Sequence, residues 1–176
     1  ALAPCQHIET VVITEPSELD ASAVNNSNVT CFGGNEGSAT GSAIGGTVAA
    51  DYQYSWNDPA NQNTALATGL VAGTYQINIT DDNGCEDSAT ITISEPQPIT
   101  TNITVDSNAS CNGIADGGVT VVANGGTVAV DYSYLWDDPS AQNTASATNL
   151  AAGSYSVTVT DDNGCNTNDN VTISEP

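Results

Sequence analysis

Two kinds of side chain in this sequence could do chemistry: the cysteines and a pair of acidic turns. Cysteine thiolates can form disulfides, bind metals or attack electrophiles. The acidic turns have the same sequence, Asp-Asp-Asn-Gly-Cys, at residues 81–85 and 161–165. Their carboxylate and amide oxygens are ligands that Ca²⁺ prefers. The cysteines are Cys5, Cys31, Cys85, Cys111 and Cys165.

The spacing of these residues shows an internal repeat. Cys5, Cys85 and Cys165 recur at intervals of 80 residues, and Pro16 and Pro96 keep the same interval. Gap-free alignment of residues 17–96 with residues 97–176 leaves roughly half of the positions identical. A repeat of this kind indicates similar folding units placed in series. We therefore predict the last strand segment of a preceding repeat at 1–16, a first repeat at 17–96 and a second at 97–176.

Each full repeat contains two cysteines, which favours one disulfide within each repeat. The expected pairs are Cys31 with Cys85 and Cys111 with Cys165, each stabilising by roughly 4 kcal/mol in the chain-entropy model. A zinc site would need about four clustered Cys or His ligands, which two cysteines per repeat do not supply. Cys5 is expected to pair outside this chain, with an earlier repeat or a neighbouring subunit. Disulfides imply an oxidising, extracellular location.

Two interpretations of the acidic turns remain open. An Asn-Gly pair alone supplies the positive φ of a tight hairpin turn. Adjacent acids in an already negative chain instead favour a bound Ca²⁺, which would relieve their repulsion. The candidate ligands are Asp81, Asp82 and Asn83, with Asp161, Asp162 and Asn163, and also Asp51, Asp131, Glu36 and Asp116.

The composition restricts the partners and the chemistry. The 176 residues include no Lys or Arg and 21 Asp plus Glu, which gives a formal net charge of −21. Nucleic acid and anionic membrane surfaces are excluded as partners, because binding them requires basic side chains. Nucleophilic catalysis requires a base such as His or Lys beside the nucleophile. With one His and cysteines assigned to disulfides, we predict no enzyme and no cofactor other than Ca²⁺.

Alternating apolar and polar residues predict short strands and no helix. A Leu-x-x-Gly-x-Tyr pattern at Leu70–Tyr75 and Leu150–Tyr155 is typical of the tyrosine corner of immunoglobulin-like sandwiches. Trp56 and Trp136 are in phase with tyrosines and are expected to pack in the core rather than stack on sugars. The predicted fold is all-β: tandem immunoglobulin-like β-sandwich repeats in a linear array.

The same motifs, in this order, resemble the repeats of SprB-type gliding adhesins of Bacteroidota. The resemblance implies a long cell-surface protein used in adhesion or gliding and exported by type IX secretion. The second copy departs from the family at Asn112-Gly113-Ile114, where Phe-Gly-Gly is usual. The segments concerned are 29–39, 54–56, 70–75, 80–85 and 91–96 in the first copy, and 110–113, 134–136, 151–155 and 160–165 in the second.

These observations lead to three hypotheses. The first is the stalk or filament module of a bacterial cell-surface adhesin, whose partners are neighbouring repeats. The second is a subunit of an extracellular polymer, in which Val11 and Ile13 of the tail add a strand to a neighbour's sandwich. The third is a Ca²⁺-dependent module that binds surface glycans through the acidic loops and an exposed aromatic side chain.

Overall fold

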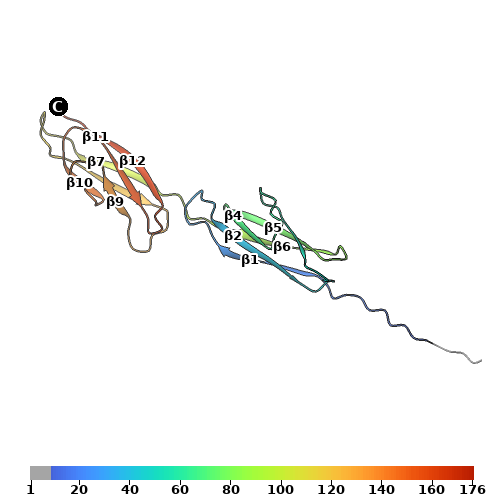
Figure 1. Ribbon diagram of the computed structural model, residues 1–176. Coiled ribbons are helices and arrows are strands. Elements are labelled where there is room, and N and C mark those ends of the chain that lie inside the picture. Colours follow the sequence, from blue (N-terminus) through green and yellow to red (C-terminus); the bar gives the residue numbers. More distant parts are fainter. Residues whose placement is uncertain (1–8) are drawn as a thin grey trace, which may run out of the picture. The chain divides into compact units, whose positions relative to one another are not determined.

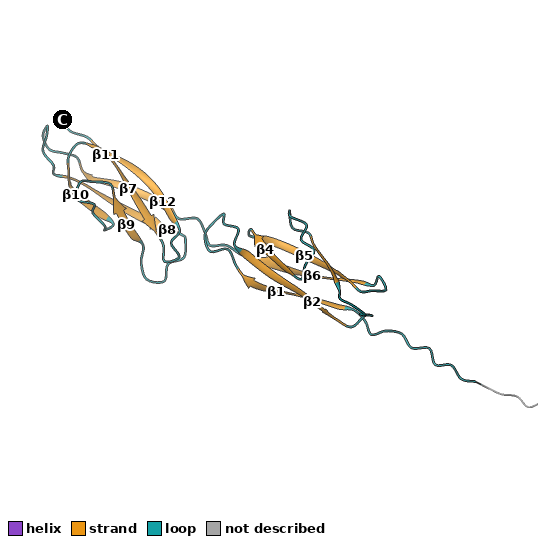
Figure 2. Ribbon diagram, in the orientation of Figure 1, coloured by secondary structure: helices purple, strands orange, loops and turns teal. Residues whose placement is uncertain are grey.

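The computed structural model describes residues 9–176 and contains strands and loops only within that range (Figure 2). None of the described residues belongs to a helix long and apolar enough to cross a membrane. The strands of the first repeat are β1 (Asp20–Ser27), β2 (Gly37–Ile44), β3 (Gln53–Trp56), β4 (Leu66–Leu70), β5 (Gly73–Thr80) and β6 (Glu86–Ile93). Those of the second are β7 (Thr100–Ser107), β8 (Gly117–Asn124), β9 (Ser133–Trp136), β10 (Ser146–Leu150), β11 (Gly153–Thr160) and β12 (Asn166–Ile173).

Each repeat forms two three-stranded sheets with the same strand order. The first repeat has the sheets β1-β2-β4 and β3-β5-β6, and the second has β7-β8-β10 and β9-β11-β12 (Figure 1). In the second repeat β8 pairs antiparallel with both of its neighbours, and so does β11. The all-β, immunoglobulin-like sandwich class predicted from sequence is confirmed.

The chain divides into two compact units by its contacts. Among the described residues, the first comprises 9–24, 40–67 and 75–91, and the second comprises 25–39, 68–74 and 92–176. The whole second repeat therefore lies in the second unit, together with the segments of the first repeat that include Cys31 and Glu95. The repeat boundaries after residues 16 and 96 stay a prediction.

The core of the second repeat consists of alternate residues from both sheets. Val119 and Val121 from β8 pack with Val157 and Val159 from β11, as the period-two pattern predicts. Trp136 is 1% exposed, and its indole Nε1–H donates to the carbonyl of Thr144 at 3.0 Å. The expected core role of the tryptophans is confirmed, because Trp56 is likewise only 2% exposed.

The tyrosine corner is present in the second repeat. The hydroxyl of Tyr155 donates to the carbonyl oxygen of Ala151 at 3.0 Å, four residues upstream. This bond holds the connection between β10 and β11 against the first residues of β11. It thereby keeps β11 in register with β9 and β12.

We expect Tyr155→Phe to lower the free energy of unfolding by about 1 kcal/mol, since it removes one hydrogen bond without removing the ring. Tyr134→Phe is the matched control, because the Tyr134 hydroxyl makes no hydrogen bond within the described residues. Urea unfolding followed by tryptophan fluorescence measures both. Equal midpoints for the two variants would contradict the assignment of a corner.

Candidate functional site

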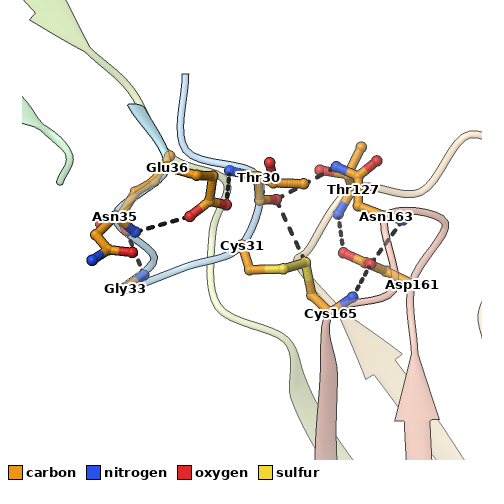
Figure 3. Close-up of a disulfide and its surroundings, with 10 residues drawn as sticks. Thr30, Cys31, Gly33, Asn35, Glu36, Thr127, Asp161, Asn163 and Cys165 are labelled. Atoms are coloured by element: carbon orange, nitrogen blue, oxygen red, sulfur yellow. Dashed lines mark hydrogen bonds between the residues drawn. A yellow bond between two sulfur atoms is a disulfide. The ribbon is translucent and has the colours of Figure 1, made fainter. Parts of the chain in front are cut away.

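A disulfide joins Cys31 to Cys165, with 5.6 Å between their Cα atoms (Figure 3). Both residues lie in the second compact unit, although Cys31 belongs to the first repeat and Cys165 to the second. Cys85 and Cys111 carry free, exposed thiols. Cys5 lies outside the described residues, so its expected external partner stays a prediction.

The predicted pairing within each repeat is therefore wrong, and strand length explains why. Cys165 immediately precedes β12, whereas Cys111 lies near the opposite end of that strand, because the N–H of Ala109 donates to the carbonyl of Ser174 at 3.0 Å. Eight strand residues span about 26 Å. A disulfide requires Cα atoms closer than about 7 Å. Cys111 and Cys165 are thus too far apart to bond, and by repeat equivalence the same strand length applies to Cys31 and Cys85.

Carboxylates hold the loop that presents Cys31, here called the first opening loop (residues 28–36). The Glu36 carboxylate accepts hydrogen bonds from the N–H groups of Thr30 at 2.8 Å and Asn35 at 2.9 Å, on either side of the cysteine (Figure 3). The bond from Thr30 is the main cause of a lowered pKa for Glu36. Glu95 accepts a further hydrogen bond from Gly33 at 2.6 Å.

The second opening loop (residues 108–116) is held in the same way around its free cysteine. Asp116 replaces Glu36 and accepts the N–H of Ser110 at 2.9 Å, and hydrogen bonds from Ser110 lower the pKa of Asp116. Glu175 replaces Glu95 and accepts the N–H of Gly113 at 3.0 Å and the side-chain amide of Asn112 at 2.7 Å. The glutamates that close each repeat therefore anchor its opening loop.

A buried aspartate organises each acidic turn, here called the closing turns (residues 81–85 and 161–165). The two oxygens of Asp161 accept N–H groups from Thr127 at 2.8 Å, Asn163 at 3.0 Å and Cys165 at 2.9 Å. Burial by itself raises the pKa of Asp161, but these backbone hydrogen bonds outweigh it and hold the pKa below its usual value. Asp81 makes the equivalent three bonds, and they lower its pKa, with the N–H of Thr47 as the largest contributor.

The backbone of these turns differs from the hairpin expected from Asn-Gly. Gly84 and Gly164 have positive φ values of 83° and 84°, whereas neither preceding asparagine does. A primed two-residue turn of type I′ would need positive φ at both positions. Instead, the Asp side chain closes a five-residue loop by accepting N–H groups two and four residues downstream.

The acid next to each buried aspartate also binds backbone rather than requiring a cation. Asp82 accepts the N–H groups of Ala49 and Ala50, and Asp162 accepts those of Ala129 and Val130. The second acid thus has a structural role that the sequence argument did not assign to it.

The predicted calcium ligands do not gather in one place. Glu36 and Asp116 belong to the opening loops, while Asp51 and Asp131 each accept the N–H of the tyrosine that follows them. Within residues 9–176 no three His, Cys, Asp or Glu side chains lie close enough together to hold a metal ion. The residues therefore do not fit a Ca²⁺ site of the predicted composition, and calcium binding by the chain stays a prediction.

A groove surrounds the disulfide. It has a volume of ≈ 390 Å³ and is lined by Cys31 and Phe32 on one side and by the 96–99 segment and the closing turn on the other. The side-chain amide of Asn163 lies 3.4 Å from the carbonyl oxygen of Thr30 and donates to it (Figure 3). Phe32 remains 57% exposed and is the exposed aromatic side chain nearest to the site.

Sequence reasoning placed the acids correctly in turns but missed what they bind. The recurring Ser-Glu-Pro triplet after β6 and β12 is a signal that could have been used. The strands β6 and β12 each follow a closing cysteine and are followed by Glu95 and Glu175. These glutamates bind the opening loops, so they mark the end of each sandwich at which the opening cysteine lies.

A comparison with known families finds the SprB repeat twice in the chain. The family model matches residues 23–61 and residues 102–141. Each match extends from the first strand of a repeat to the turn after its tryptophan strand, and includes the opening loop and its cysteine. The closing turns lie outside both matched segments. No curated protein matches the chain in sequence.

Several solved structures resemble the fold at low identity. The C-terminal fragment of intimin, in complex with the intimin-binding domain of its translocated receptor, is 12% identical with a TM-score of 0.43; the match covers 91% of this chain but only 64% of that one. The first two immunoglobulin domains of DIP-gamma are 14% identical with a TM-score of 0.37, and the match covers 89% of this chain and 97% of that one. Murine CEACAM1b is 14% identical with a TM-score of 0.33, and the match covers 90% of this chain and 100% of that one. Because each TM-score is below 0.5, none bears on function.

Cys31→Ser and Cys85→Ser form a matched pair that tests the disulfide. The bond closes a segment of 134 residues, so we expect Cys31→Ser to lower the stability by up to roughly 5 kcal/mol, whereas Cys85→Ser leaves it unchanged. Thermal melting without reductant measures both. Equal losses of stability in the two variants would instead support a disulfide between Cys31 and Cys85 within the first repeat. Peptide mapping with a Glu-specific protease identifies the bonded pair directly, since trypsin has no cleavage site in a chain without Lys or Arg.

Asp161→Asn tests the closing turn through its pH dependence. A lowered folded-state pKa stabilises the protein fully above the unfolded pKa of about 4, and this contribution disappears as the pH falls through the folded pKa. We expect the variant to lose about 2 kcal/mol at pH 7, because an amide nitrogen would face the Thr127 N–H, and to approach wild type as the pH falls through the lowered pKa of Asp161.

Asp131→Asn is the control for this measurement, because it removes the same charge from an exposed carboxylate that accepts only the adjacent N–H of Tyr132. Melting temperatures between about pH 2 and pH 8 give the comparison. A constant difference between Asp161→Asn and wild type over this range would show that the Asp161 charge contributes nothing.

Proposed function

We propose that this chain is an extracellular, non-catalytic adhesin-type module that forms part of a stalk or filament, since the SprB repeat model matches it twice, over residues 23–61 and 102–141. Two family repeats in series and two sandwiches of the same topology support this role. Every buried side-chain oxygen and nitrogen among the described residues has a hydrogen-bond partner, as in well-folded domains generally. The carboxylates described above bind backbone, which leaves none of them arranged as an acid–base pair.

The observation that carries the proposal is the position of the disulfide. A stalk must transmit tension along its chain without lengthening. Tension applied at the two ends of this chain passes from Cys31 directly to Cys165, so the chain between them, a sequence separation of 134, is not stretched. Within the sandwiches the tension then acts only on β1 and β12, which lie outside the segment between the two bonded cysteines.

Single-molecule pulling from the two termini tests this function. In the oxidised protein only the residues outside the 31–165 segment can lengthen, whereas reduction should release about 47 nm more, at up to roughly 3.5 Å for each of 134 residues. Cys31→Ser should behave like the reduced protein and Cys85→Ser like the oxidised one. Unfolding of both sandwiches in the oxidised wild-type chain would contradict the role in carrying tension.

Secretion by the type IX route, gliding motility and calcium binding are further parts of this proposal. The first two follow from the SprB-type resemblance, and calcium from the net charge of −21. A melting temperature that is the same in millimolar calcium and in chelator would remove calcium from the proposal. Binding of the chain to a glycan array, with and without calcium, decides the separate hypothesis of glycan recognition.

A specific observation favours one second candidate, the strand-exchanged polymer. Val11 and Ile13 are 80% and 92% exposed. In β6, by contrast, Ile93, the repeat equivalent of Ile13, is 1% exposed, and Ile91, the equivalent of Val11, is half-buried. Exposed alternating apolar residues are able to add to a sheet edge. Val11→Asp together with Ile13→Asp should then abolish any oligomers of the chain seen in size-exclusion chromatography under reducing conditions, whereas oligomers that persist would exclude strand addition by the tail.

A further inference from the structure

The two free cysteines are the repeat equivalents of the two bonded ones. Cys111 occupies the position of Cys31 and Cys85 the position of Cys165, each displaced by 80 residues. The free pair is exposed, while both bonded residues are half-buried. A free thiol alone indicates little, so the surroundings of each decide what it can bind.

The loop around Cys111 already has the conformation of the bonded loop. Its backbone is attached to the end of β12 through Ala109 at 3.0 Å, as Val29 attaches the first loop through Ser94 at 2.9 Å. Gly113 and Gly33 share a φ of 75°. The second opening loop therefore presents Cys111 as the first presents Cys31, without a disulfide to hold it there.

A groove next to Cys85 matches the one that surrounds the disulfide. Its volume is ≈ 380 Å³ against ≈ 390 Å³, and eight of its nine lining residues are repeat equivalents of residues that line the first groove. Cys31 and Phe32, which complete the first groove, have no counterpart among the residues lining the second. The walls that receive an opening loop are thus present beside Cys85.

We propose that Cys85 and its groove bind the second opening loop of another copy of this repeat pair, forming a disulfide between Cys85 and the other copy's Cys111. In a longer tandem chain the adjoining repeat would supply the same loop, and every repeat would be bonded to both of its neighbours. This inference rests on the proposed function, since it names the partner of that same site.

Bond formation requires an oxidant, for which a low-molecular-weight disulfide such as oxidised glutathione suffices. The Cys111 thiolate attacks the glutathione disulfide, forms a mixed disulfide and releases one glutathione thiolate. The Cys85 thiolate of the second copy then attacks the Cys111 sulfur and releases the second glutathione. Two cysteine protons and two electrons end on two molecules of reduced glutathione.

Charge distinguishes the two grooves. The Cys85 groove contains Glu18 and Glu86, where the bonded groove contains Pro98 and Asn166. The incoming loop is itself acidic at Asp116 and is anchored by Glu175. Repulsion between these carboxylates slows the approach of the second copy at low salt and is screened when the Debye length falls below about 8 Å.

Two complementary variants of the full chain test the pairing, both carrying Cys5→Ser. One also carries Cys85→Ser and keeps only the Cys111 thiol, and the other carries Cys111→Ser and keeps only the Cys85 thiol. The two, distinguished by a mass tag, are mixed in a glutathione redox buffer at about 0.5 M salt, which screens the carboxylates. Non-reducing intact-mass analysis counts the three kinds of dimer. Random pairing yields twice as much mixed dimer as either homodimer, and we expect at least about tenfold more.

Glu175→Gln in the Cys111 copy provides the internal control, because it weakens the anchor of the opening loop and leaves the thiol in place. We expect the preference for mixed dimer to fall toward the random ratio. A twofold ratio in the unmodified pair, or no dimer while Cys31–Cys165 stays formed by mapping, overturns the proposal. Either result leaves the pulling experiment unaffected, so the failure of this inference is distinguishable from failure of the stalk function.

Discussion

The structure depends on one constraint: a chain with 21 carboxylates and no Lys or Arg must satisfy its acids without side-chain cations. It does so with backbone N–H groups. Asp161 takes three of them in a closing turn, Glu36 takes two in an opening loop, and the buried Asp138 takes the N–H groups of Ser140 and Gln142. Charge-assisted hydrogen bonds of this kind are stronger than neutral ones. The loops that hold the cysteines are therefore built by the acids that make the chain so negative.

The disulfide follows from these loops and from strand geometry. Opening and closing cysteines lie at opposite ends of the final strand of a repeat, so neither can reach its partner in the same unit. Instead, Cys31 of the first repeat bonds Cys165 of the second. Two repeats that each lack a disulfide of their own are thereby covalently linked to each other. For a module that spans distance, a bond at this position resists extension better than one confined to a single sandwich.

Local patterns predicted the scaffold well. Alternation of apolar and polar residues predicted short strands and no helix, and the phase of Trp136 with the tyrosines assigned it to the interior. The Leu-x-x-Gly-x-Tyr motif located the corner bond of Tyr155. The pattern gives little signal for β4 and β10, because only two of five residues in each are buried and β4 contains a glycine with positive φ. The calcium interpretation arose because sequence shows that two acids are adjacent but not that N–H groups from Thr127 and Ala129 reach them.

By itself the sequence determined the 80-residue period, the all-β class and the equivalence of the cysteines in successive repeats. These properties depend only on residue type and spacing, which are visible directly in one sequence. Only the tertiary structure decided which cysteines bond. Pairing requires Cα atoms a few ångströms apart, and that separation depends on an eight-residue strand between Cys165 and the loop of Cys111. The period is the same for a pair within one repeat and a pair across two, so spacing alone could not distinguish them.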